Sequence, residues 1–296
     1  MRPIRSLLIY IIVIFFGGAL LAPWLYWLAQ SIAPSSHLAN SPFHRYLDRA
    51  LLGIALIGMW PLLRSLGARS MQDLGLVKPS GQWHRLLGGF ALGFISLACF
   101  ALIVLAAGGR TLNEHLTSSQ LLAKLAGAGA TAVALGLLEE LLFRGTIFGA
   151  LRRIWDWRAA LLVSSMIYAI VHFLGKADLI GPVTWHSGLD LLPRKLAAFG
   201  NWQLVIPGFF NLTLVGIMLG FAYQKTGNLY FSMGLHAGWI FWLKSYGALT
   251  NTVKTANLSF WGTEKLTDGW IALFILAMAF LILTRLRLTK SNPPAT

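Results

Sequence analysis

Long apolar runs are the feature of this sequence that most limits what it can fold into. A helix needs about 20 mainly apolar residues to cross a bilayer, and eight stretches of the chain meet this requirement. Hydrophobic residues make up 56% of the chain and charged residues only 11%, whereas a soluble domain carries about 25% charged residues. A large soluble surface and a disordered chain are therefore both excluded. The predicted spans are residues 7–29, 46–66, 86–107, 129–151, 158–175, 203–223, 229–248 and 268–286.

These runs predict an all-α fold, a polytopic membrane bundle of about eight transmembrane helices that forms one integral membrane domain over residues 1–296. The first run is too long for the apolar part of a cleaved signal peptide, about 7–15 residues, so we expect a retained helix. Gly89 and Gly93 are spaced as in helices that approach each other closely in a membrane. The connections 108–128 and 176–202 are long enough to hold structure, and the second is either an interfacial helix or a loop.

The basic residues of the chain predict its orientation. The net charge of +14 arises from lysines and arginines that lie between the apolar runs, so no nucleic-acid partner is expected. With the N-terminus inside, more of them fall on the cytoplasmic side, and an even number of spans places both termini there. Short loops and the lack of a targeting peptide favour a bacterial inner membrane. The single cysteine, Cys99, can build neither a disulfide nor a cysteine-based metal site.

The fourth span carries charged residues near its centre. Each charge at that depth costs about 2.5–3.5 kcal/mol on insertion scales, and folding alone would favour leucine at these positions. Glu140 and Arg144 are four residues apart and can pair on one helix face. Glu139 lies about 100° around the helix from Glu140 and points at a different neighbour. An ion pair that holds helices together explains Glu140 and Arg144. It does not explain Glu139, which is left available for chemistry.

Two histidines within predicted spans, His172 and His236, are candidate partners for Glu139. A carboxylate with two imidazoles can activate a water for attack on a carbonyl, with a histidine donating to the oxyanion. The same three groups and a water can also bind a catalytic zinc ion. Proton-coupled transport is a third use of buried glutamate and histidine. The sequence has neither H-E-x-x-H nor an intramembrane G-x-S-x-G, which argues against the familiar metalloprotease helix and a serine nucleophile.

Three motifs on consecutive predicted spans resemble those of one enzyme family. The order and spacing are similar to the CAAX protease and bacteriocin-processing (CPBP, or Abi) intramembrane proteases, and to type II CAAX prenyl endopeptidases. The resemblance covers about residues 120–245. The motifs are Glu139-Glu140-x-x-x-Arg144, then Tyr168-x-x-x-His172 with Tyr in place of the usual Phe, and the stretch 216–229 that leads to His236.

The resemblance implies an intramembrane endopeptidase that cleaves peptide or protein substrates in or at the lipid bilayer. In such an enzyme Glu139 and His172 would activate the water, and His236 would help to stabilise the oxyanion. Glu140 and Arg144 would hold the site together. The resemblance favours a metal-free, glutamate-type mechanism without a cofactor. The alternative is zinc, which would be bound by Glu139, His172 and His236.

One departure from the family concerns the oxyanion. The family commonly has Asn four residues after the third-motif histidine, and this chain has Ile240 there. Loss of one oxyanion donor can raise the barrier by about 2.7–4 kcal/mol. Either Asn211 or Tyr168 substitutes, or activity is slow, or the chain is a non-catalytic member that acts as a membrane interaction or immunity factor. Structural hydrogen bonding is the expected role of Asn211.

Overall fold

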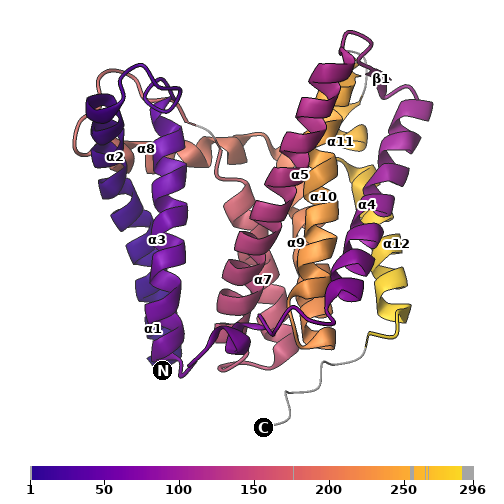
Figure 1. Ribbon diagram of the computed structural model, residues 1–296, viewed down its shortest axis with the longest axis horizontal. Coiled ribbons are helices and arrows are strands. Elements are labelled where there is room, and N and C mark those ends of the chain that lie inside the picture. The colour runs from indigo at the N-terminus through magenta and orange to yellow at the C-terminus, as the bar shows by residue number, and fades with distance from the viewer. Residues whose placement is uncertain (1, 176, 254–256, 264, 266, 289–296) are drawn as a thin grey trace. The chain divides into compact units, whose positions relative to one another are not determined.

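The computed structural model is almost entirely helical (Figure 1). It describes residues 2–288 except 176, 254–256, 264 and 266. Helices account for 75% of the structure, which confirms a nearly all-α fold. A two-stranded antiparallel ribbon pairs β1 (Arg110–Leu112) with β2 (Thr250–Thr252).

The helices fall into regular and distorted segments. The distorted ones are two π-helical segments, η1 (Val13–Gly17) and η3 (Leu141–Phe148), and two 3₁₀ segments, η2 (Met71–Leu74) and η4 (Leu196–Gly200). The α-helices are α1 (Arg2–Ile12), α2 (Gly18–Ile32), α3 (Phe43–Ser65), α4 (Trp83–Ala106), α5 (Ser118–Glu140), α6 (Gly149–Leu151), α7 (Trp157–His172), α8 (Ser187–Lys195), α9 (Trp202–Thr226), α10 (Tyr230–Leu249), α11 (Leu258–Trp261) and α12 (Trp270–Arg285).

Five helical stretches among the described residues are long and apolar enough to cross a membrane, judged by length and composition. The other three predicted spans also form helices, namely α7, α10 and α12. However, α7 and α12 have only 16 residues each, and α10 is not among the five. About eight spans are therefore not confirmed, and these three stay predictions. The five stretches are Ile4–Ile32, Phe43–Ser65, Trp83–Ala106, Ser118–Leu151 and Trp202–Thr226.

Both long connections contain helix. The fourth predicted span starts at Ser118 rather than near residue 129, because Thr117 forms a capping box with Gln120. The Thr117 hydroxyl accepts from the Gln120 N–H at 3.3 Å, and the Gln120 side chain accepts from the Thr117 N–H at 3.1 Å. In the second connection α8 is a helix rather than a loop, and its Leu191 is fully buried.

The chain divides into two compact units. The first comprises Met1–Arg69 and Val171–Asn201. Its apolar core lies where α2, α3 and α8 meet, and Leu191 is at its centre. The buried ammonium of Lys195, the last residue of α8, contacts Asp48 in α3 at 2.7 Å. This ion pair therefore ties α8 to α3.

The second unit comprises Ser70–Ile170 and Trp202–Thr296, and α10 is its central helix. It packs against both α4 and α5 (Figure 1), and its residues 231–240 are all buried. Gly89 in α4 and Gly234 in α10 lie at a crossing so close that a Cβ on either would collide with the backbone of the other helix. The glycine spacing in α4 thus corresponds to a tight helix contact, which holds α10 in place.

We expect Gly234→Ala to lower the free energy of unfolding by about 1–3 kcal/mol, because the added methyl group overpacks a backbone contact that cannot shift freely. Unfolding of the purified protein in detergent micelles measures the effect. Gly127→Ala is the matched control, since nothing lies within 4 Å of a Cβ at Gly127 in α5. That control should be unchanged, or more stable by up to about 1 kcal/mol. Equal stability of the two variants would contradict the tight crossing.

Candidate functional site

A change in helix type separates the two glutamates from the arginine of their motif. Glu139 and Glu140 end α5, and Arg144 lies within the π-helical η3 that follows directly. The hydrogen bond from the Gly149 N–H to the Arg144 carbonyl spans five residues, as a π-helix requires. Short π-helical segments inside α-helices occur often at functional sites. The helix is therefore irregular at the point where its charges lie.

Glu140 and Arg144 form the ion pair that their spacing predicts. The Arg144 Nη1 donates to Glu140 Oε1 at 2.9 Å, and both side chains are buried, with exposed fractions of 0% for Glu140 and 3% for Arg144. The Arg144 Nη2 also donates to the carbonyl oxygen of Gly216 in α9, at 3.4 Å. The pair consequently connects the η3 segment to α9 as well as to the end of α5.

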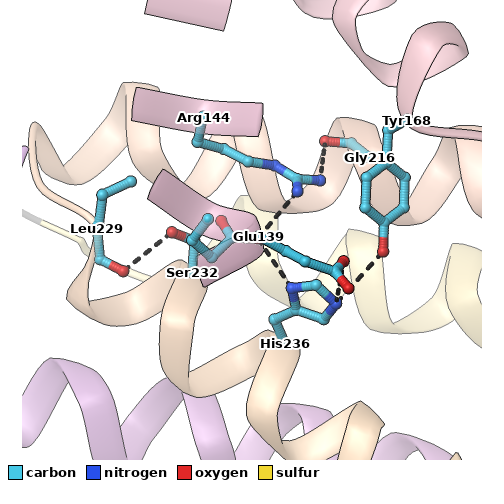
Figure 2. Close-up of polar contacts among 8 residues, drawn as sticks. Glu139, Arg144, Tyr168, Gly216, Leu229, Ser232 and His236 are labelled. Atoms are coloured by element: carbon cyan, nitrogen blue, oxygen red, sulfur yellow. Dashed lines mark hydrogen bonds and ion pairs between the residues drawn. The ribbon is translucent and has the colours of Figure 1, made fainter. Parts of the chain in front are cut away.

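His236 contacts both carboxylates, and Figure 2 shows its contact with Glu139. Its Nδ1 is 3.0 Å from Oε1 of Glu140, and its Nε2 is 3.6 Å from Oε2 of Glu139. The imidazole is buried, whereas the Glu139 side chain keeps 21% of its surface exposed. The two neighbouring glutamates therefore differ: Glu140 is enclosed by Arg144 and His236, and Glu139 contacts His236 while part of it stays accessible.

Tyr168 in α7 completes this cluster. Its hydroxyl is 3.3 Å from Nε2 of His236, the nitrogen that also faces Glu139 (Figure 2). The guanidinium of Arg144 lies 4.6 Å from the centre of the tyrosine ring, and Phe143 meets that ring edge-on at 4.9 Å. The ring is thus held on two sides, and its hydroxyl is directed at the imidazole.

The structure brings together five of the predicted site residues, Glu139, Glu140, Arg144, Tyr168 and His236. His172 is the last residue of α7, belongs to the first unit, and has an exposed side chain. Its role in activating water stays a prediction.

Asn211 and Ile240 occupy different surroundings. Both hydrogens of the Asn211 amide are used, because Nδ2 donates to the carbonyl oxygens of Thr267 at 2.9 Å and Gly269 at 2.8 Å. This buried side chain therefore fastens α9 to the residues that precede α12. Ile240 packs in an apolar cluster with Ala132 of α5. Its side chain has no polar group and cannot donate a hydrogen bond.

Gly216 begins the third-motif stretch, and its carbonyl group contributes to the site in a way that the sequence did not predict. Its carbonyl oxygen accepts from Arg144 of η3, and α9 also lies very close to α7 at this point. A Cβ on Gly216 would lie only 2.7 Å from the Cβ of Ser165. The G-x-x-x-G spacing of Gly216 and Gly220 was a signal of close helix approach, although it did not indicate which partner the carbonyl would have.

The cluster has the groups for acid–base chemistry on water. A carboxylate on a partly exposed side chain, beside an imidazole and a phenol, can take up and return a proton. Within the described residues, no group of three or more His, Cys, Asp or Glu side chains is arranged to hold a metal ion. Both ring nitrogens of His236 already have polar contacts, with Glu140 on one side and with Glu139 and Tyr168 on the other.

Comparison with protein families places this site in a known context. Residues 120–242 match the family described as type II CAAX prenyl endopeptidase Rce1-like. The match confirms the resemblance to the CPBP and CAAX protease family, and it contains all five residues of the cluster. No curated protein and no solved structure matches the chain. Together with the apolar helices, the family match identifies the chain as an integral membrane protein.

We expect Arg144→Met to lower the free energy of unfolding by about 3–5 kcal/mol, because it leaves the buried Glu140 charge without its partner. Unfolding in detergent micelles again provides the measurement. Arg158→Met is the control, since Arg158 is exposed at the start of α7 and its loss should cost no more than about 0.5 kcal/mol. If the two variants were equally stable, the buried ion pair would not support the fold.

Proposed function

We propose that this chain is an intramembrane endopeptidase that cleaves membrane-associated peptides or proteins. The observation that carries the proposal is the position of Glu139, whose side chain is 21% exposed and lies beside His236 in an otherwise buried cluster. This arrangement lies within the region that matches the Rce1-like family, whose members are generally proteases. A carboxylate that served folding alone would be expected to be enclosed and paired, as Glu140 is.

In the proposed reaction Glu139 acts as the general base. Its carboxylate takes a proton from a water molecule while the water oxygen bonds to the carbonyl carbon of the scissile peptide. The carbonyl π electrons move to oxygen and form an oxyanion. The C–N bond then breaks, and the amine leaves with the proton that Glu139 had accepted. The products are a carboxylic acid and an amine, so Glu139 is regenerated.

The remaining residues position the base and stabilise charge. By the resemblance of its motif, His172 shares the activation of water with Glu139. His236 helps to stabilise the oxyanion, and Glu140 orients its imidazole through the 3.0 Å contact at Nδ1. Arg144 balances the charge of Glu140 in a site from which water is largely excluded, where an unpaired charge would be costly.

We infer that the reaction needs no metal ion or other cofactor. The support is the hydrogen bonding of His236, because a metal would have to displace Glu139 and Tyr168 from Nε2 or Glu140 from Nδ1. The alternative is a zinc-assisted reaction, in which Glu139, His172 and His236 would hold the ion and the ion would supply a water of lowered pKa.

The class of substrate and the location of the protein are proposed from less specific features. The matched family is described as a prenyl endopeptidase family, and we propose a membrane-associated peptide or protein as the substrate without assigning a prenyl group to it. The excess of basic residues on one side supports cytoplasmic termini. A bacterial inner membrane is the proposed location.

A second candidate function rests on Ile240. This residue is buried among apolar side chains where the family commonly has a hydrogen-bond donor. A chain without that donor can be a non-catalytic member that binds a membrane partner. Such a protein would need the fold but not the carboxylate of Glu139, which separates the two candidates experimentally.

We expect Glu139→Gln to lower the formation of new peptide termini in membranes by about 10²–10⁴-fold, the usual contribution of a general base. Quantitative terminal proteomics on membranes with matched amounts of folded protein measures this rate. Glu114→Gln is the control, since Glu114 is exposed in the segment between β1 and α5. Identical termini from wild type and Glu139→Gln would exclude proteolysis and favour the non-catalytic candidate.

The same assay tests the role of a metal. Membranes incubated with a strong zinc chelator should produce the Glu139-dependent termini at an unchanged rate. Loss of these termini with the chelator, followed by recovery on addition of zinc, would establish the zinc-assisted alternative.

A further inference from the structure

The sequence left two candidates for the donor that Ile240 does not supply, and hydrogen bonding separates them. A primary amide has two N–H donors, and those of Asn211 already bind the carbonyl oxygens of Thr267 and Gly269. Asn211 therefore has no hydrogen left for an oxyanion. The hydroxyl of Tyr168, in contrast, faces the functional cluster itself, 3.3 Å from Nε2 of His236.

The contacts of His236 determine which atom donates in the contact with Tyr168. Glu140 is paired with Arg144, and an ionised carboxylate can only accept hydrogen bonds. Nδ1 of His236 must therefore carry the proton in its 3.0 Å contact with Glu140. In a neutral imidazole Nε2 is then the acceptor. The Tyr168 hydroxyl consequently donates to Nε2.

The surroundings of Tyr168 keep this hydroxyl in place. Arg144 covers the face of the ring and Phe143 meets its edge, and only 2% of the residue is exposed. The Nε2 atom that it contacts is also the one nearest to Glu139, at 3.6 Å. A neutral donor is thus held beside the carboxylate that would activate the water.

We propose that Tyr168 is a further residue of the peptidase site. In the resting protein its hydroxyl donates to Nε2 of His236 and fixes the imidazole with the proton on Nδ1. During the reaction the same hydroxyl supplies the hydrogen bond to the oxygen that becomes negative on the substrate carbonyl. His236 has no hydrogen on Nε2 in this state, so it contributes to the stabilisation of the oxyanion by positioning the Tyr168 hydroxyl. This inference rests on the proposed function, and it assigns to α7 the donor that α10 lacks at Ile240.

Tyr168→Phe removes the hydroxyl and keeps the ring. We expect it to lower kcat by about 10²–10³-fold, the usual effect of losing one oxyanion donor, with little change in KM. The probe is a synthetic peptide that spans a cleavage site identified by its dependence on Glu139. Tyr246→Phe is the matched control, because Tyr246 is buried in α10 and its hydroxyl has no hydrogen-bond partner among the described residues. The control should retain the wild-type kcat.

A second measurement is independent of activity. The full-length protein, labelled with ¹⁵N-histidine and reconstituted in phospholipid bilayers, gives imidazole nitrogen signals, and those of His236 are the ones lost in His236→Gln. We expect a protonated Nδ1 and an unprotonated, hydrogen-bonded Nε2. The Nε2 signal should shift in Tyr168→Phe and stay in place in Tyr246→Phe. A purely structural role of the ring would leave it unchanged.

The outcomes separate this inference from the proposed function. A wild-type kcat in folded Tyr168→Phe, or an Nε2 signal that does not respond to that substitution, would overturn the role of Tyr168 while Glu139-dependent cleavage still stood. Absence of any Glu139-dependent termini from the wild type would overturn the proposed function and the oxyanion role with it. A reduced kcat together with a shifted Nε2 signal would support the inference.

Discussion

The buried contact between Glu140 and Arg144 is the interaction on which the rest of the site depends. Two charges within a membrane-spanning helix are costly unless they are paired and hydrogen-bonded. Here the guanidinium reaches the Glu140 carboxylate, the Gly216 carbonyl and the face of Tyr168. One arginine therefore links the α5–η3 helix to both α9 and α7, and the carboxylate that it neutralises remains able to accept from His236.

The position of His236 depends in turn on how closely the helices around α10 approach. Glycines at the crossing of α4 and α10 allow backbone contact, and residues 231–240 are all buried as a result. In a membrane, association of helices relies on such packing because lipid provides no hydrophobic drive between them. The small residues of α10 and the carboxylates of α5 are thus parts of one arrangement, since a wider spacing would take the imidazole out of reach of both glutamates.

The sequence predicted those parts of the site whose signals are local. Two carboxylates and an arginine within an apolar run are conspicuous, and the i,i+4 spacing of Glu140 and Arg144 was sufficient to pair them correctly. The start of α5 was predicted wrongly although its signal is also local, because the capping box of Thr117 and Gln120 lies outside the apolar run. The count of about eight spans stays a prediction, since α7 and α12 have only 16 residues each.

Other features of the site depend on tertiary packing, and no local sequence pattern predicts them. The contact between Tyr168 and His236 joins α7 and α10, two helices that are far apart in the sequence. The sequence marked the tyrosine as a replacement for phenylalanine and as one of two candidate donors, and the isoleucine at 240 as the loss of a donor, but it could not choose between the two candidates. In the structure the tyrosine adds a hydroxyl from α7 to the imidazole, whereas Ile240 of α10 packs in an apolar cluster. An oxyanion needs a hydrogen-bond donor at a given place, and the helix that supplies the donor does not matter. A donor on α7 in place of one on α10 can therefore conserve the reaction while it alters the motif by which the family is recognised.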